Sequence, residues 1–239
     1  MRATRLIAAA AVLAAAVAAA GPVPARSRSR AAGPPVVVEL FTAQGCASCP
    51  DADAMMADLA GRKDLIALTF SVDYWDYLGT KDSFAQPAFT FRQQAYVDRL
   101  KVREMYTPEA VVDGAAEGPA EPDRVAALID KAQRARRSGP RLTVLRHGVR
   151  VGPGGADGRT ADVWLVRYDP RPLRTKVKGD DGKTRSVVET DVVRGLARLG
   201  GWRGGARDFP IPPATDDLKT VVLVQLPHGG RILAAARVG

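Results

Sequence analysis

The chain has only two cysteines, Cys46 and Cys49, and they stand where one structural element should give way to another. Residues 36–42 before them are mostly β-branched or apolar, which favours a buried strand. Pro50 follows the second cysteine, and proline is favoured in the first turn of a helix. The pattern predicts a strand, a short loop and a helix that begins at the cysteine pair. Two thiols separated by two residues at such a junction indicate thiol–disulfide chemistry.

The N-terminal segment 1–20 predicts an export signal. Arg2 and Arg5 precede an alanine-rich apolar stretch that ends in small residues suited to cleavage. The alternative is an uncleaved signal anchor, but the stretch is shorter than the roughly 20 residues that a membrane span needs. We therefore expect a periplasmic or secreted protein with no membrane span in the mature chain. Residues 21–35 predict a disordered, basic tether.

The chain carries a formal net charge of +9, which raises the question of anionic partners. Its arginines are scattered, however, and they form no basic stripe interleaved with aromatic residues. We therefore expect no nucleic-acid partner.

The order of predicted elements indicates an α/β domain at residues 36–138 followed by a β-rich domain at 139–239. In the first domain we expect three strands, the third of them short, and three helices, at residues 36–42, 50–60, 65–72, 86–100, 109–112 and 122–137. In the second we expect a small antiparallel, sandwich-like arrangement with strands at 142–145, 149–151, 162–168, 220–226 and 231–238, and a short helix at 191–199.

Four segments carry a resemblance to a known family. They are residues 39–53 (ELFTAQGCASCPDAD), 72–79 (VDYWDYLG), 106–108 (YTP) and 111–114 (VVDG). Together they resemble an exported bacterial domain-of-unknown-function family with a thioredoxin-like fold. The resemblance implies that Pro108 is a cis proline packed against the dithiol of Cys46 and Cys49. It implies a fold but no substrate, and residues 188–191 lack the histidine often found at that place in the family.

The position of the cysteines at a helix N-terminus predicts their roles. We expect Cys46 to be the exposed, attacking thiol and Cys49 to be the resolving one, with a helix end that stabilises the thiolate. Ser48 is the predicted N-cap, paired with Asp51 in an acidic capping box. Because Asp51 and Asp53 would add negative charge there, we expect only a moderate lowering of the pKa of Cys46.

A second group of residues concentrates aromatic and acidic side chains where the second strand should end. Asp73, Tyr74, Trp75 and Asp76, together with Thr107, are interpreted as a substrate-contact surface. The alternative is a packed turn whose aromatic residues seal the end of the sheet and whose Asp73 caps a neighbour.

Aromatic residues also lie just before and along the predicted helix at 86–100. Phe84, Phe89, Phe91 and Tyr96 are interpreted as core residues rather than as the lining of a ligand pocket.

These patterns predict an extracytoplasmic thiol–disulfide oxidoreductase with no bound cofactor. Its partners would be protein thiols or disulfides, met through a mixed disulfide, and a redox partner protein. The alternative is a non-catalytic envelope binding protein in which the disulfide is structural or redox-sensing. A soft-metal site is a weaker alternative, because two thiolates supply half of a tetrahedral site and His147 and His228 belong to a distant segment. We expect no metal.

Overall fold

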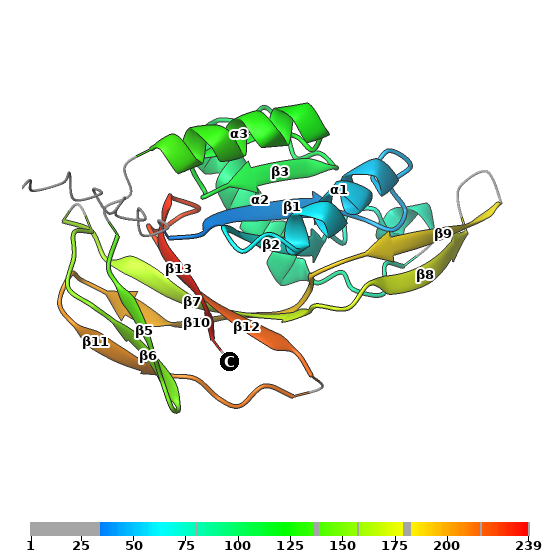
Figure 1. Cartoon of the computed structure of the whole chain (residues 1–239). Coiled ribbons are helices and arrows are strands. Elements are labelled where there is room, and N and C mark those ends of the chain that lie inside the picture. The colour runs from blue at the N-terminus through cyan, green and yellow to red at the C-terminus, as the bar shows by residue number, and fades with distance from the viewer. Residues whose placement is uncertain are drawn as a thin grey trace, which may run out of the picture. The chain divides into compact units, whose positions relative to one another are not determined.

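An eight-stranded mixed sheet runs through the chain (Figure 1). The computed structural model describes residues 34–79, 81–135, 139–156, 158–178, 183–215 and 217–238. The sheet has the strand order β13-β12-β7-β10-β2-β1-β3-β4. Its members are β1 (Val36–Thr42), β2 (Leu65–Ser71), β3 (Glu109–Val112), β4 (Ala116–Pro119), β7 (Ala161–Asp169), β10 (Val192–Trp202), β12 (Lys219–Gln225) and β13 (Ile232–Val238). The expected signal at 1–20 and nearly all of the expected tether lie outside the described residues.

Three helices pack on this sheet, and each has a proline in its first turn. They are α1 (Pro50–Ala60), α2 (Pro87–Leu100) and α3 (Pro122–Arg134), and a short 3-10 helix, η1, spans Asp76–Leu78. The predicted strands and helices of the first half are confirmed to within a few residues at their ends. Among the described residues, none of the helices has the length and apolar character needed to cross a membrane.

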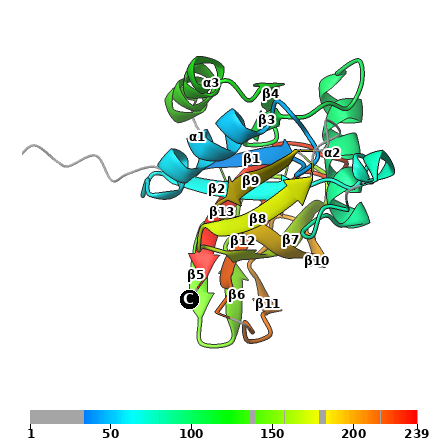
Figure 2. The ribbon, with the colours of Figure 1, turned by 90° about the vertical axis from the view of Figure 1, so that its right-hand side faces the viewer.

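The central strand β1 explains how the helices are divided between the two faces of the sheet. All seven of its residues are buried, as expected for a strand that pairs on both sides and is covered on both faces. Val36, Val38 and Leu40 share a core with α1 and α3, whereas Val37 and Phe41 share one with α2. Alternation along β1 therefore places α2 opposite the other two helices (Figure 2).

The second half adds strands to the same sheet and two smaller sheets beside it. Residues 191–199 were expected to form a helix, and this prediction is wrong because most of them belong to β10, which pairs antiparallel with β7. Gly195 and the glycines at 200 and 201 disfavour a helix there. The smaller sheets contain β5 (Leu142–Leu145), β6 (Gly148–Val151) and β11 (Arg207–Pro210), and the pair β8 (Leu173–Lys178) and β9 (Thr184–Glu189).

The two halves meet at strand β2. β10 runs parallel to β2 with Val192 opposite Thr69, and the hydroxyl of Thr69 donates a hydrogen bond to the carbonyl oxygen of Thr190 at 2.7 Å. Apolar residues of the second half, including Val193 and Leu223, share a buried cluster with aromatic residues of the first. The α/β and β-rich segments thus contribute to one continuous sheet, while their independence as domains stays a prediction.

Truncation tests that independence. A chain that ends at residue 138 would lose β10 from the edge of β2 and all the second-half members of the shared core, so we expect it to lose cooperative unfolding. Denaturant unfolding followed by circular dichroism, with residues 34–239 as the control, measures this. A sharp, reversible transition in the truncated chain would show that the first half folds alone.

Candidate functional site

Cys46 and Cys49 form a disulfide in the loop that leads from β1 into α1. Their Cα atoms lie 5.4 Å apart, and the backbone N–H of Cys46 donates to the carbonyl oxygen of Ala43 at 3.0 Å. Cys49 itself is the N-cap of α1, and no side chain caps this helix. The prediction that Ser48 is the N-cap is therefore wrong. The tight turn places its hydroxyl 3.5 Å from the Sγ atom of Cys46 instead.

Both cysteines are buried. Cys46 is 3% exposed and Cys49 is 1% exposed, so the expectation of an exposed attacking thiol is also wrong. The sulfur atoms belong to the apolar core under α2, and the half-buried rings of Tyr74 and Trp75 pack against that core. Ala47 and Ser48, the two residues between the cysteines, are exposed to solvent.

Trp75 connects the segment after β2 to the proline loop. Its indole Nε1 donates a hydrogen bond of 2.8 Å to the hydroxyl of Thr107. The Thr107–Pro108 peptide bond is cis, which confirms the cis assignment, while the packing of Pro108 against the dithiol stays a prediction. On the dithiol side, Gly45 lies beside Trp75, and a Cβ added to Gly45 would be in ordinary van der Waals contact with the Cβ of Trp75, at 3.8 Å. The structure thus brings the cysteine loop and Trp75 together, and it links Trp75 to Thr107.

The acidic members of the predicted contact surface are occupied by local hydrogen bonds. Asp73 accepts a bond of 2.5 Å from the hydroxyl of Thr90 on α2, and Asp76 accepts one of 3.0 Å from the backbone N–H of Asp82. These contacts fit the packed-turn interpretation for both acids. Tyr74 differs, because its buried hydroxyl has no hydrogen-bond partner among the described residues, and burial raises its pKa to about 12.

Asp53 lies one helical turn after Cys49 and is buried, with 2% exposure. Its Oδ1 atom accepts a hydrogen bond of 2.9 Å from the hydroxyl of Thr42, while its Oδ2 atom is buried without a partner in the described structure. Burial, helped by repulsion from Glu189 and opposed by the Thr42 bond, raises the pKa of Asp53 to about 8. At neutral pH this carboxyl is mostly protonated, so it does not add the negative charge that the sequence suggested.

Gln44 ties the cysteine loop to the second half of the chain. Its backbone N–H donates to Asp82 at 2.7 Å and its side-chain amide donates to Glu189 at 2.9 Å. The other oxygen of Glu189 accepts from Ser71 at 3.1 Å. Burial, partly offset by the Gln44 bond, raises the pKa of Glu189 to about 7. Sequence reasoning missed this network because Glu189 is 145 positions from Gln44.

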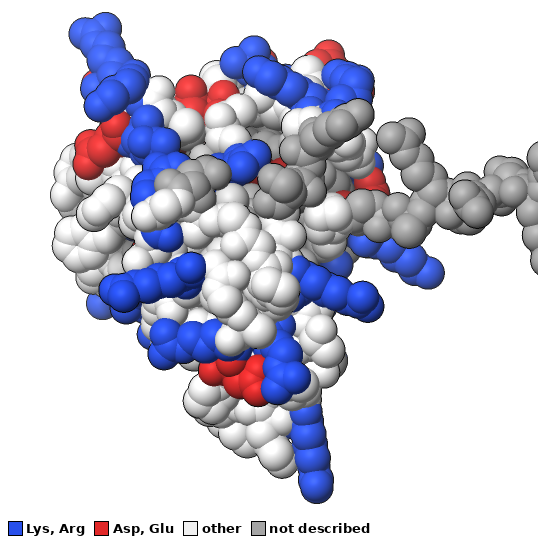
Figure 3. Space-filling model, turned by 90° about the vertical axis from the view of Figure 1, so that its left-hand side faces the viewer, with Lys and Arg blue, Asp and Glu red and all other residues white. Residues whose placement is uncertain are grey.

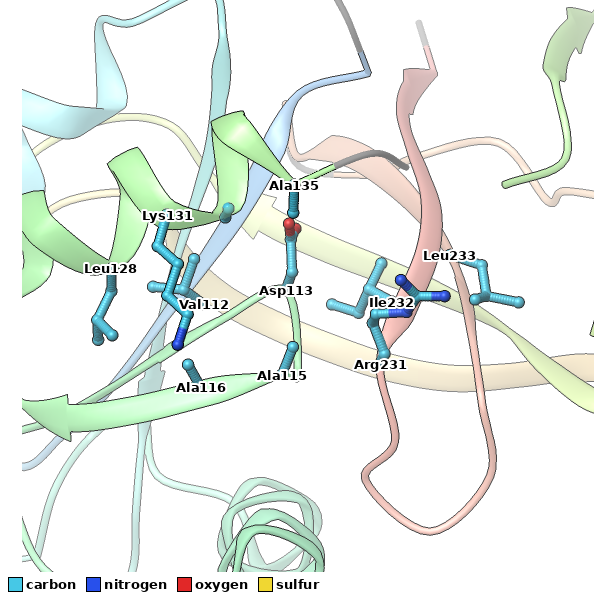
Figure 4. A pocket seen from close by; sticks show the side chains of 11 residues that line it. Val112, Asp113, Ala115, Ala116, Leu128, Lys131, Ala135, Arg231, Ile232 and Leu233 are labelled. Carbon is cyan, nitrogen blue, oxygen red and sulfur yellow. The ribbon is translucent and has the colours of Figure 1, made fainter. Parts of the chain in front are cut away.

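Other surface features show less chemistry. The cavity in Figure 4 lies between α3, the β3–β4 turn and β13, with a volume near 120 Å³. Its lining is mainly alanine and aliphatic, and Asp113 there accepts a hydrogen bond from the backbone N–H of Val37 at 2.9 Å.

Lys and Arg are dispersed over one face, separated by uncharged surface (Figure 3). Within the described ranges, His, Cys, Asp and Glu form no group of three or more that could hold a metal ion.

The chain matches the model of one protein family. The family described as "Protein of unknown function (DUF1223)" matches residues 37–225. The chain belongs to this family. The resemblance to a domain-of-unknown-function family is therefore confirmed.

Two solved structures are similar to the chain. Protein AGR_C_4864 from Agrobacterium tumefaciens is 28% identical, with a TM-score of 0.68 over 85% of this chain and 93% of that one. HBP35 of Porphyromonas gingivalis shares the fold at 13% identity, with a TM-score of 0.54 over 85% of this chain and 74% of that one. No curated protein matches the chain.

The raised pKa of Asp53 predicts how stability depends on pH. The unfolded chain releases this proton near pH 3.8, whereas the folded protein keeps it up to about pH 8, so raising the pH between these values favours unfolding. For this carboxyl alone the slope is at most about 1.4 kcal/mol per pH unit. We expect Asp53→Asn to flatten the pH dependence of the free energy of unfolding.

Denaturant unfolding at about pH 5 and about pH 8 measures this slope. Asp51→Asn is the matched control, because Asp51 is exposed in the same first turn of α1. Identical slopes in the wild type and Asp53→Asn would contradict a raised pKa at Asp53.

Proposed function

We propose that the chain is an extracytoplasmic thiol–disulfide oxidoreductase, and that residues 36–138 form a thioredoxin-like fold around its dithiol. One observation carries the proposal: a Cys46–Cys49 disulfide at the N-terminus of a helix, with Trp75 packed on its core and hydrogen-bonded beside the cis Thr107–Pro108 bond. The export signal expected at residues 1–20 supports a periplasmic or secreted location, where such disulfides persist.

The disulfide contributes little to stability by chain entropy, which favours a chemical role. The two cysteines are three positions apart, so the loop they close is very short. A bridge of this kind removes little freedom from the unfolded chain. The core around it is large and apolar and does not depend on a staple.

The proposed exchange proceeds in two steps, in which bonds, electrons and protons balance. A substrate thiolate attacks the Sγ atom of Cys46, the Cys46–Cys49 bond breaks, and Cys49 leaves as a thiolate that takes up a proton. A second substrate thiol loses its proton, attacks the mixed disulfide and releases Cys46. The substrate gives up two electrons and two protons, and the cysteine pair gains them. The reverse sequence reduces a substrate disulfide.

Burial gives this exchange two requirements. Since Cys46 is 3% exposed, a substrate sulfur reaches it only if side chains around the loop move. We assign that movement to the half-buried ring of Trp75. The leaving thiolate of Cys49 needs a proton, and Asp53 carries one at neutral pH a single helical turn away.

The burial of both sulfur atoms also favours a second candidate. In it the chain is a non-catalytic envelope binding protein whose disulfide is structural or redox-sensing. The two candidates differ in whether a mixed disulfide with another protein forms at Cys46.

Reduction of insulin disulfides in the presence of a small dithiol tests the proposal. We expect the wild type to accelerate the reaction, and Cys46→Ser to lower that rate by at least about tenfold because the thiolate that attacks the insulin disulfide is gone. Ala47→Ser is the matched control, since Ala47 is exposed in the same loop and is neither cysteine. Cys49→Ser should accumulate a mixed disulfide at Cys46, which mass spectrometry of the trapped adduct identifies.

A wild-type rate equal to that of Cys46→Ser, both in insulin reduction and in the refolding of a scrambled disulfide substrate, would reject the oxidoreductase. It would leave the binding protein with a structural or sensing disulfide.

A further inference from the structure

A cavity of about 450 Å³ lies between α2 and the sheet, away from the cysteine pair. One face of α2 forms one wall, through Ala88, Phe91, Arg92, Ala95 and Tyr96 at helical spacing. Side chains of β7 and β10 and the end of β12 form the opposite wall, and α2 stands on the same side of the molecule as β7 and β10 (Figure 2). Its volume falls within the range of small-molecule sites, which is about 300–1,000 Å³.

Phe91 is the most unusual member of the cavity wall. Its ring is 73% exposed, whereas Phe89 and Tyr96 on the same helix are fully buried. Phe91 was expected to be a core residue, and this prediction is wrong because its ring is exposed and lines the cavity. Trp164, half-buried, and Leu196 line the same cavity, and the Arg92 guanidinium lies over the Trp164 ring, 5.9 Å from its centroid. An exposed aromatic ring and an indole in one cavity provide apolar surface for a flat ligand.

The base of the cavity holds a buried charged pair that leaves one donor unused. Arg92 donates through Nε and Nη2 to the Glu39 carboxylate, at 2.9 and 3.1 Å, and through Nη2 to the Tyr96 hydroxyl at 2.9 Å. No described residue accepts a hydrogen bond from its Nη1 atom. Arg92 lines the cavity, and its side chain is 6% exposed.

Gln225 provides the complementary acceptor beside this donor. Its Nε2 atom donates to the Tyr96 hydroxyl at 2.9 Å and to the carbonyl oxygen of Gly230 at 2.8 Å, which fixes the orientation of the amide. In the described structure nothing donates to its Oε1 atom, and Gln225, which is 2% exposed, lines the same cavity as Arg92. The donor of Arg92 and the acceptor of Gln225 thus flank the same tyrosine hydroxyl.

The walls of the cavity are held in place. A Cβ added to Gly229, in the turn after β12, would lie 2.4 Å from the carbonyl oxygen of Ala95, so this turn packs directly on α2. At the rim, Arg198 and Asp162 form an ion pair of 2.7 Å between β10 and β7. A rigid wall and a neutral base reduce the cost of ordering on binding.

We propose that this cavity binds a small planar aromatic molecule that carries a carboxamide. The amide carbonyl accepts from Nη1 of Arg92, the amide N–H donates to Oε1 of Gln225, and the ring lies between Phe91 and Trp164. A carboxylate fits less well, because Gln225 presents an acceptor and Glu39 already neutralises Arg92. The site does not depend on the dithiol or on the proposed redox function.

Isothermal titration of the full chain with three indole compounds tests the proposal. We expect indole-3-acetamide to bind, and 3-methylindole and indole-3-acetate to bind at least about tenfold more weakly. 3-Methylindole lacks both amide hydrogen bonds, and indole-3-acetate lacks the N–H that donates to Gln225. The indole N–H signal of Trp164 in a nitrogen–proton NMR spectrum should shift, while those of Trp75 and Trp202 stay in place.

Phe91→Ala removes one wall without touching the core, and we expect it to weaken binding of indole-3-acetamide by about tenfold. Tyr77→Ala is the matched control, because Tyr77 is an equally exposed aromatic residue, at 79%, that does not line the cavity. Absence of binding up to millimolar concentration, equal affinity for all three compounds, or an unchanged affinity in Phe91→Ala would each overturn the proposal.

Discussion

A buried ion pair between Glu39 and Arg92 joins the central strand to the helix that covers one face of the sheet. The side chains are 0% and 6% exposed, and burial of such charges is costly unless hydrogen bonds satisfy them. Here Arg92 contacts both carboxylate oxygens, and the Tyr96 hydroxyl donates to Glu39 and accepts from Gln225 on β12. The pair therefore fixes α2 against both halves of the chain, and the proposed ligand cavity shares this base.

Burial of acids also sets the environment of the cysteine pair. Desolvation raises the pKa of Asp53 to about 8 and those of Glu189 and Glu109 to about 7, and it raises the pKa of Asp82. Near neutral pH the carboxyls of Asp53, Glu189 and Glu109 hold protons for much of the time. The carboxyls of Asp53 and Glu189 therefore carry less negative charge than the count of acidic residues suggests. In the proposed exchange, Asp53 supplies the proton that the leaving thiolate of Cys49 takes up.

Sequence reasoning succeeded where local rules are strong. β-branched runs predicted β1 and β2, and the prolines at helix starts predicted α1. It failed where long-range pairing decides the outcome. Glycine-containing residues of β10 became a strand because β7 lies beside them, and Ser48 lost the cap because the disulfide loop places Cys49 there. The Gln44–Glu189 bond joins positions that no local pattern connects.

By itself the sequence determined the strand–loop–helix unit that holds Cys46 and Cys49 and the resemblance that led to the cis assignment of Pro108. These depend on residues that are neighbours in the chain or on motifs that can be read directly. Only the tertiary structure decided that both sulfurs are buried, that Asp53 is mostly neutral, and that Phe91 faces outward over a cavity. Exposure and pKa depend on which distant segments exclude water from a side chain, and that arises only when the sheet has assembled.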